Sequence, residues 1–497
     1  MTRDNLHFRF TIVGEQHSFR LIEFEGEEAL SSAYRFEVTL LSVELLEQPE
    51  SLVWKPCALE MKGVRQRAVK GIVSQVMLMD KQGSDYQYKI SMRPAFWGLS
   101  QEIGCEVFLE CSVIDCISTV LSKTRPGLYL PFELKLTQQY SRQEIFCKYN
   151  ESSFDFVSRL MEQFGLYYYF DGSAGVETLI ICDDKIAHQP LPNPSYRYYP
   201  PTGLDVYEQV DLVSSFCHSS ELLPNNILLK HYDYEKPDVE LEGIANVDEN
   251  GIGQQFFYGD YFDGRQQGNA LAKHRAEQSV SAARCCHAQA RDPSMCSGST
   301  FTLTDHFLAS CNQAYLIVGV SHYGRFGGAD NMLLYRNDLQ CLPANQQYRA
   351  PNHTPRPQIA GLINATIDGA GEGEVAMLDE QGRYKVRLPF DLGNPNEGKA
   401  SHWVRKLTPF GGKNEGMHFP LRKGAEVKLA CEQGDPSRLV IVGVVSNSNT
   451  PSVVNQGNAN AHVIKTASGT SMTLQDGTAQ SHVLIQSDAG TYIKISS

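Results

Sequence analysis

Residues 146–168 read FCKYNESSFDFVSRLMEQFGLYY and carry the strongest local pattern in the chain. Ser152 with Asp155 three positions later resembles a capping box, so a helix is predicted to begin at Ser152 or Ser153. Gly165 supplies a stop signal for that helix. Its apolar face is predicted to consist of Phe154, Val157, Leu160, Met161 and Phe164. The aromatic run at 167–170 is typical of a sheet core, so the stretch predicts one helix leading into a buried strand.

Strand patterns dominate the sequence on either side of this helix. Apolar and polar residues alternate at 35–40 and at 86–92, which is the period of a half-buried strand. The Pro-rich run Pro192–Gly203 predicts an irregular connection. The Ala-rich segment Gly268–Ala290 predicts a second long helix, ended by Asp292-Pro293, after which strands return. The predicted fold class is mainly β with a few helices.

The C-terminal third is organised differently. Pro343–Pro357 is rich in Pro, Asn and Gln and lacks periodicity, and we place a linker at 346–357. Residues 358–450 hold five short strand candidates with almost no helix signal, which predicts a small closed or nearly closed barrel. The candidates are Gln358–Ile367, Tyr384–Phe390, His402–Lys406, Glu426–Cys431 and Leu439–Val445. The predicted domains are therefore an N-terminal region at 1–345, the linker, the barrel and a tail at 451–497.

The tail repeats itself at an offset of 20 to 21 residues. His462-Val463 begins one copy and His482-Val483 begins the next, and each copy reads as strand, Gly-containing turn, strand. One copy cannot bury its own apolar face, so such repeats need stacked neighbours or other chains. Alternate residues of a strand share a face. We therefore expect an intertwined oligomer whose core contains Met472, Leu474, Val483, Ile485, Ile493 and Ile495.

Charge and hydropathy exclude several function classes. The chain has 44 Lys and Arg against 57 Asp and Glu, a net charge of −13. An acidic chain lacks the positive field that binding to nucleic acid or an anionic membrane usually requires. The opening MTRDNLHFRF contains no apolar run and no 18-residue apolar stretch follows, so we expect neither a signal peptide nor a transmembrane helix.

The sequence also lacks a recognisable catalytic or metal-binding motif. Its 13 cysteines are scattered without a CxxC pair and are expected to be reduced thiols. Cys285-Cys286-His287 has no second pair at zinc spacing. Asn246–Gly251 imitates half a calcium loop, but Phe257 stands where a bidentate Glu is required, so we expect an Asx-rich turn. GxSxG, HExxH and Walker patterns do not occur. We expect no catalytic, cofactor-binding or metal-binding residues and no cofactor.

Specific motifs nevertheless identify a family. Residues 146–168 closely resemble the QYNES-x-x-FVSRLLE signature of VgrG, the spike of the bacterial type VI secretion system. Further matches to that family occur, in order, at 258–270, 379–386, 401–405, 424–427 and 434–443. The departures are Leu439 and Ser437 after the GDP motif and the basic turn at 420–424, and they concern the subfamily.

This resemblance implies a fold and a function. The chain would form a homotrimer whose N-terminal region resembles the phage baseplate hub, with two related β-barrel domains per chain. It would sit on the tube protein Hcp, with an oligonucleotide/oligosaccharide-binding (OB) barrel leading into a three-chain β-helix capped by a PAAR-type tip protein. The predicted function is a structural spike, not an enzyme. It would be assembled in the bacterial cytoplasm with baseplate components and exported with effectors and adaptors, touching the target membrane only by puncture.

Three other functions compete with this interpretation. A hub of a phage tail or of an extracellular contractile particle shares the fold. An evolved spike with an effector domain is an alternative only if that domain lies beyond residue 497, because the roughly 47 residues after Thr450 are too few for a catalytic domain. An OB-type ligand binder needs a basic or aromatic groove. The barrel block offers Trp403, Phe410 and Phe419 without dense Lys and Arg.

Overall fold

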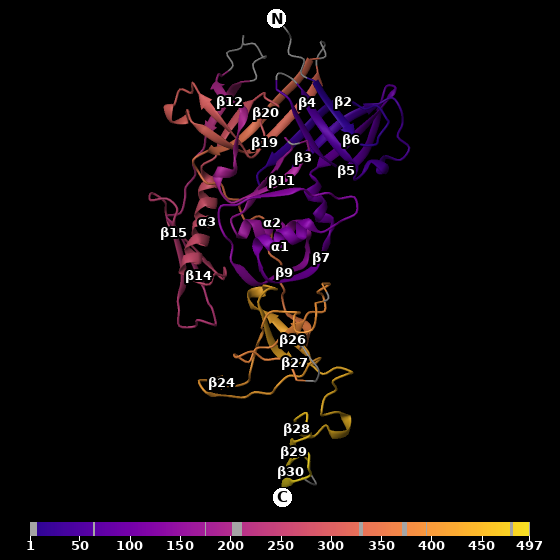
Figure 1. Ribbon diagram of the computed structural model, residues 1–497, viewed down its shortest axis with the longest axis vertical. Helices are drawn as coiled ribbons and strands as arrows, with labels where there is room; N and C mark the ends of the chain where they lie inside the picture. Colours follow the sequence, from indigo (N-terminus) through magenta and orange to yellow (C-terminus); the bar gives the residue numbers. More distant parts are fainter. Residues whose placement is uncertain are drawn as a thin grey trace. The chain divides into compact units, whose positions relative to one another are not determined.

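The computed structural model describes residues 7–62, 65–173, 175–200, 211–327, 332–369, 375–393, 395–477 and 481–496. The chain divides into two compact units, 1–357 and 358–497, whose elements are labelled in Figure 1. Strands hold 46% of the residues and helices 14%, so the predicted mainly-β class is confirmed.

The first unit begins with a six-stranded antiparallel half-barrel. The strands lie in the order β1-β4-β5-β6-β3-β2. Their bounds are β1 His7–Ile12, β2 Arg20–Ala29, β3 Arg35–Ser42, β4 Pro56–Lys62, β5 Arg67–Gln82 and β6 Asp85–Arg93. The two alternating stretches predicted as strands lie in β3 and β6, which pair with each other so that Val38 is opposite Ile90. Both side chains are fully buried, and the two strand predictions are confirmed.

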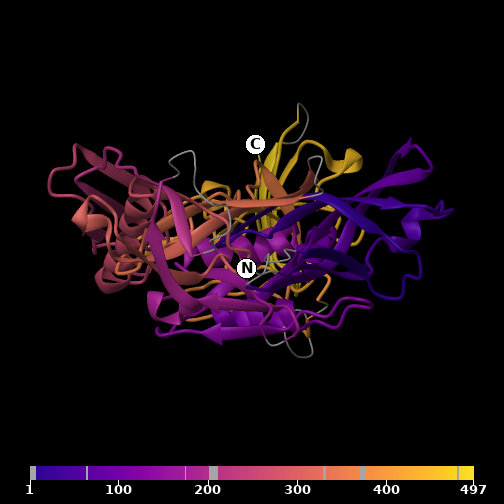
Figure 2. The same cartoon turned by 90° about the horizontal axis from the view of Figure 1, so that it is seen from above.

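Six later strands of the same unit form a closed barrel. Their order is β19-β18-β12-β13-β17-β20, and β20 closes the ring by pairing with β19. The bounds are β12 Gln189–Tyr198, β13 Leu212–His218, β17 Cys286–Ala290, β18 Ser299–Thr304, β19 Ala314–Gly327 and β20 Met332–Pro343. Figure 2 shows the indigo half-barrel and the magenta-to-orange closed barrel side by side, and they share one sheet through β2 and β19.

The irregular connection predicted at Pro192–Gly203 is wrong over its described part, because β12 runs through it to Tyr198. The parallel ladder between β12 and β18 shifts register between Pro190 and Ser195. Proline has no N–H to donate to a ladder. The prolines at 192 and 194 lie in this interruption, so the strand tolerates them. Residues 201–210 lie outside the described residues.

The second predicted helix is correct in its first part only. Helix α3 spans Arg265–Ala283, whereas the end of the predicted segment forms strand β17. In β17 the small side chains of Cys286, Ala288 and Ala290 alternate into the closed barrel's core. Packing against that core therefore overrides the helical preference of an Ala-rich sequence.

A lobe of two helices and two small sheets lies between the barrels in sequence. Its elements are β7 Ile103–Ser112, α1 Val113–Ser122, β8 Phe132–Lys135, β9 Arg142–Ser152, α2 Ser153–Gln163, β10 Tyr167–Asp171 and β11 Thr178–Cys182. Helix α2 confirms the helix predicted from the opening motif, and the Ser152 hydroxyl accepts a hydrogen bond from the Asp155 N–H at 2.9 Å. Gly165 follows with a φ of +72°, as a helix stop requires. The predicted buried strand is β10.

A small sheet packs along helix α3. It consists of β14 Asn226–His231, β15 Leu241–Asn246 and β16 Gln254–Tyr258 (Figure 1). Ala272 and Ala276 of the helix pack with Ile227 and Leu229 of β14. The segment after β15 is the predicted Asx turn, in which the Asp248 carboxylate accepts a hydrogen bond from the Asn250 N–H at 2.9 Å.

The second unit contains a small barrel. Its sheet has the order β22-β21-β26-β27-β23, and the two ends meet at a bridge where Tyr384 and Val404 exchange backbone hydrogen bonds of 2.9 and 2.7 Å. The bounds are β21 Leu362–Ile367, β22 Val386–Arg387, β23 Arg405–Lys406, β26 Glu426–Cys431 and β27 Leu439–Val444, with a separate hairpin of β24 Gly411–Gly412 and β25 Glu415–Gly416. Each of the five predicted strand segments contains one of these strands.

A buried ion cluster holds the half-barrel to the closed barrel. Glu28 of β2 accepts hydrogen bonds of 2.6 and 2.7 Å from Arg67 of β5, and its Oε1 lies 2.9 Å from His322 Nε2 of β19. The other nitrogen of His322 lies 2.6 Å from the Tyr335 hydroxyl of β20. Burial alone would raise the pKa of Glu28, but the charge and hydrogen bonds of Arg67 and the hydrogen bond from His322 hold it at about 2. The carboxylate is therefore ionised at neutral pH.

Replacing this carboxylate should destabilise the junction. Glu28→Ala leaves the guanidinium of Arg67, whose side chain is only 17% exposed, without its carboxylate partner. Removal of one member of a buried pair costs up to about 3–5 kcal/mol. Glu27→Ala removes the same charge from an exposed neighbour on the same strand and should change the free energy of unfolding by less than about 0.5 kcal/mol. Urea denaturation followed by circular dichroism measures both. If Glu28→Ala and Glu27→Ala lower the free energy of unfolding equally, the cluster does not stabilise the junction.

A second, partly buried carboxyl, that of Glu177 beside β11, docks the helical lobe on the half-barrel. It accepts a hydrogen bond from the Tyr34 hydroxyl and one of 3.2 Å from the Ala95 N–H. Tyr34 also packs edge-on against Phe170, with 5.2 Å between the ring centroids. Burial raises the pKa of Glu177 from 4.5 to about 8, against the lowering effect of these hydrogen bonds. A carboxyl with this pKa keeps its proton at mildly acidic pH and loses it as the pH rises through about 8.

This raised pKa predicts a pH dependence of stability. The folded state keeps a proton that the unfolded chain releases near pH 4.5, so the contribution of Glu177 falls as the pH rises from about 4.5 to about 8. Glu177→Gln mimics the protonated form and should be more stable than the wild type above pH 8 and similar to it at pH 5. Glu133→Gln, at an exposed position of β8, is the matched control. Melting temperatures between pH 5 and 9 test this, and parallel profiles of wild type and Glu177→Gln would contradict it.

Candidate oligomer interface and a hollow between the barrels

The tail is a four-stranded antiparallel meander made of two equivalent hairpins. The strands are β28 Ala461–Lys465, β29 Ser471–Gln475, β30 His482–Gln486 and β31 Tyr492–Ser496. Both hairpin turns have the same hydrogen bond of 2.8 Å, from Thr466 N–H to the Thr470 carbonyl and from Ser487 N–H to the Thr491 carbonyl. Corresponding residues of the two hairpins are therefore 21 positions apart.

The register places the six predicted core residues on one face of this meander. Met472 is opposite Ile485 and Leu474 is opposite Val483 across β29 and β30. Across β30 and β31, Val483 is opposite Ile495 and Ile485 is opposite Ile493. Residues opposite each other in an antiparallel ladder point to the same side. We call this surface the tail face and define it by the strand positions 462, 464, 472, 474, 483, 485, 493 and 495.

The tail face is largely exposed in the single chain. Its isoleucines, Met472 and Leu474 are between 36% and 67% exposed, with the highest value at Ile495. The other face of the same strands is more polar and includes Lys465, Thr473, Gln486 and Lys494. Soluble proteins rarely leave a contiguous apolar surface uncovered, and such patches usually mark interaction sites.

Sequence reasoning missed two members of the tail face. Ile464 is opposite Met472, and His462 is opposite Leu474. The 21-residue spacing of the glycines at 469 and 490 would have found Ile464, because it corresponds to Ile485. Aligning the repeats on His462 and His482 obscured this, since those two histidines are 20 positions apart and lie on opposite faces.

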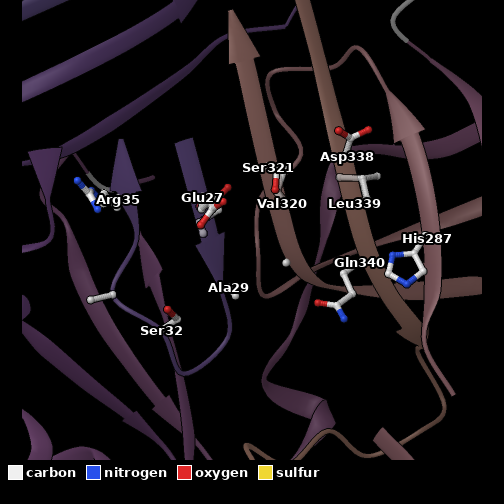
Figure 3. A pocket seen from close by; sticks show the side chains of 13 residues that line it. Glu27, Ala29, Ser32, Arg35, His287, Val320, Ser321, Asp338, Leu339 and Gln340 are labelled. Atoms are coloured by element: carbon white, nitrogen blue, oxygen red, sulfur yellow. The ribbon is translucent and has the colours of Figure 1, made fainter. Parts of the chain in front are cut away.

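A hollow of about 400 Å³ lies where the two barrels share strands. Figure 3 shows Glu27, Ser321 and Asp338, which stand on the neighbouring strands β2, β19 and β20 and are opposite one another in the register. Ala29 and Gly319 form the next row, and their small size leaves the space open. The lining mixes acidic, basic and neutral polar residues, and Glu28 of the ion cluster is one of them.

The described residues form no group of three or more His, Cys, Asp or Glu that could hold a metal ion within one chain. All 13 cysteines are free thiols, and none of the helices described is long and apolar enough to cross a membrane. Cys285 and Cys286 are buried, and burial raises the pKa of both thiols.

Comparisons with known proteins match both units. Residues 27–328 match the phage tail baseplate hub (GPD) family. Residues 372–445 match the type VI secretion system/phage-baseplate injector OB domain. The predicted OB barrel is therefore confirmed.

Curated relatives are type VI secretion system spike proteins. The chain is 31% identical to VgrG1b of Pseudomonas aeruginosa and 30% identical to VgrG1a of the same organism, over 86% of this chain in both cases. It spans 59% of the length of VgrG1b and 67% of VgrG1a. It is also 27% identical to the actin cross-linking toxin VgrG1 of Vibrio cholerae, of which it covers 40%.

Solved structures share the fold. The Escherichia coli type VI secretion component c3393, described as similar to the T4 phage tail proteins gp27 and gp5, superposes with a TM-score of 0.65 at 20% identity. That match covers 88% of this chain and all of the E. coli chain. A chain of the half-lidded Francisella PdpA–VgrG complex gives a TM-score of 0.64 at 10% identity, covering 99% of this chain and 89% of that one.

Proposed function

Because this chain belongs to the VgrG family of type VI secretion system spike proteins, we propose that it is a homotrimeric, non-catalytic spike that carries effectors through a target envelope. The observation that carries the proposal is the exposed tail face. A single chain leaves it open, whereas three chains arranged around one axis cover each other's apolar side chains and strand edges.

The energy available from the tail is substantial. Burying one aliphatic side chain contributes about 1.5–3 kcal/mol, and a threefold arrangement buries three copies of each. The side chains that would supply this burial form the needle core. They are Met472, Leu474, Val483, Ile485, Ile493 and Ile495, together with Ile464. The needle would then present a pointed end to a PAAR-type tip protein.

The first unit is suited to the base of the spike. It contains one half-barrel and one closed barrel, and three chains would bring six such elements into a ring. A ring of six related elements matches the symmetry of a hexameric Hcp-like tube protein, which we propose as the partner at this end. Assembly would take place in the bacterial cytoplasm, and the contractile apparatus would then export the spike.

The relatives favour a type VI system over a phage tail. Identity to the curated spike proteins reaches 31%, whereas the prophage MuSo2 tail protein of Shewanella oneidensis shares the fold at 10% identity and a TM-score of 0.51.

Mass measurement tests the trimer directly. Light scattering during gel filtration of the full chain at micromolar concentration should give three times the chain mass of 55.5 kDa. A monomer at that concentration would overturn the proposed function.

The tube protein encoded in the same genome should bind the trimer at its first unit.

A substitution in the tail tests its part in the trimer separately. Ile485→Asp places three carboxylates near one axis in a poorly hydrated interior, so the tail should fray and lose its protease resistance and its tip protein. The first unit should still hold the three chains together. Gln486→Asp, at the neighbouring position on the other face, is the matched control and should keep both properties. Limited proteolysis with mass spectrometry measures the result, and a tail that stays resistant in Ile485→Asp would contradict the assignment.

A further inference from the structure

The tail face contains one polar residue among apolar ones. Of its eight strand positions, 462 alone carries a side chain that is not aliphatic or Met. The equivalent position in the second hairpin, 21 residues later, is Val483. Three chains that bury the tail face would therefore bring three imidazoles to one level of an otherwise apolar interior.

The hydrogen bond of His462 fixes which ring nitrogen remains available. Its Nε2 lies 3.0 Å from Oδ2 of Asp476, which follows strand β29. A carboxylate can only accept, so Nε2 donates its hydrogen and Nδ1 of the neutral ring keeps its lone pair. Both side chains are about two thirds or more exposed in the single chain, at 68% and 77%. The free nitrogen is therefore accessible to other copies of the chain.

From this arrangement we propose that the three His462 side chains of the trimer bind one divalent transition-metal ion on the threefold axis. The inference rests on the proposed trimer, because each chain would contribute a single imidazole to the site. Sheets packed face to face lie about 10 Å apart, so each lies about 5 Å from the middle, within reach of an imidazole.

The chemistry of the pair suits a metal. Histidines that bind metals usually donate their other ring N–H to a carboxylate, which fixes the tautomer and raises the basicity of the ligand, and Asp476 occupies that place. Imidazole ligands favour zinc, nickel, copper and iron over magnesium or calcium. Three carboxylates and one divalent cation leave a small net charge of −1, so the ion offsets most of the negative charge that the three aspartates bring.

Cobalt(II) titration of the full-length trimer tests the site. Protein stripped with a chelator should bind one Co²⁺ per three chains at pH 8, with the visible absorption of a low-coordinate cobalt centre, and Zn²⁺ should displace it.

Three variants test whether His462 and Asp476 themselves form the site. His462→Val installs the residue of the equivalent position and should abolish Co²⁺ binding while the protein remains trimeric. Asp476→Asn should weaken binding by about 10–100-fold. His482→Ala changes the histidine on the other face and should leave Co²⁺ binding unchanged.

The outcomes distinguish this inference from the proposed function. A trimer that does not bind Co²⁺, or one whose binding survives His462→Val, overturns the metal site and leaves the spike intact. A monomer overturns the proposed trimer and the metal site together.

Discussion

The first unit depends on the pairing of β19 with three strands at once. Along its length β19 pairs with β18 and β20 of the closed barrel and with β2 of the half-barrel. The consequence is a sheet that passes from one barrel to the other with no hinge between them. The side chains on the inner face of this sheet pack inside the first unit, away from water. The polar residue at its centre, His322, is fully buried and needs an internal partner, which Glu28 provides.

Sequence patterns predicted the elements that local forces determine. Helix α2 was found because its cap, its apolar spacing and its glycine stop all lie within 14 residues. Strand β12 and the end of α3 were misread because barrel closure, which joins distant segments, overrides proline and alanine preferences there. The ion cluster was not predicted at all, since Glu28 and His322 are 294 positions apart and neither carries a local signal.

The candidate interface was predictable in part for the same reason. Two-residue alternation within each strand identified six apolar side chains, and the register joins them on one face. Ile464 and His462 were missed because the repeat was aligned on identical letters, whereas the turns set the true spacing. In a repeat whose strands are only five residues long, an error of one position moves every side chain to the other face.

The two parts of the chain are stabilised by different means. In the first unit the buried carboxylate of Glu28 pairs with Arg67 of the same chain, and the aromatic cores of both barrels are filled by that chain's own side chains. The tail has the opposite property, because its strands pair within the chain but its apolar side chains remain exposed. In the trimer that we propose, other copies of the chain would cover this face. The tail would then bury its apolar side chains only when chains meet, after the first unit has brought three tails together at high effective concentration.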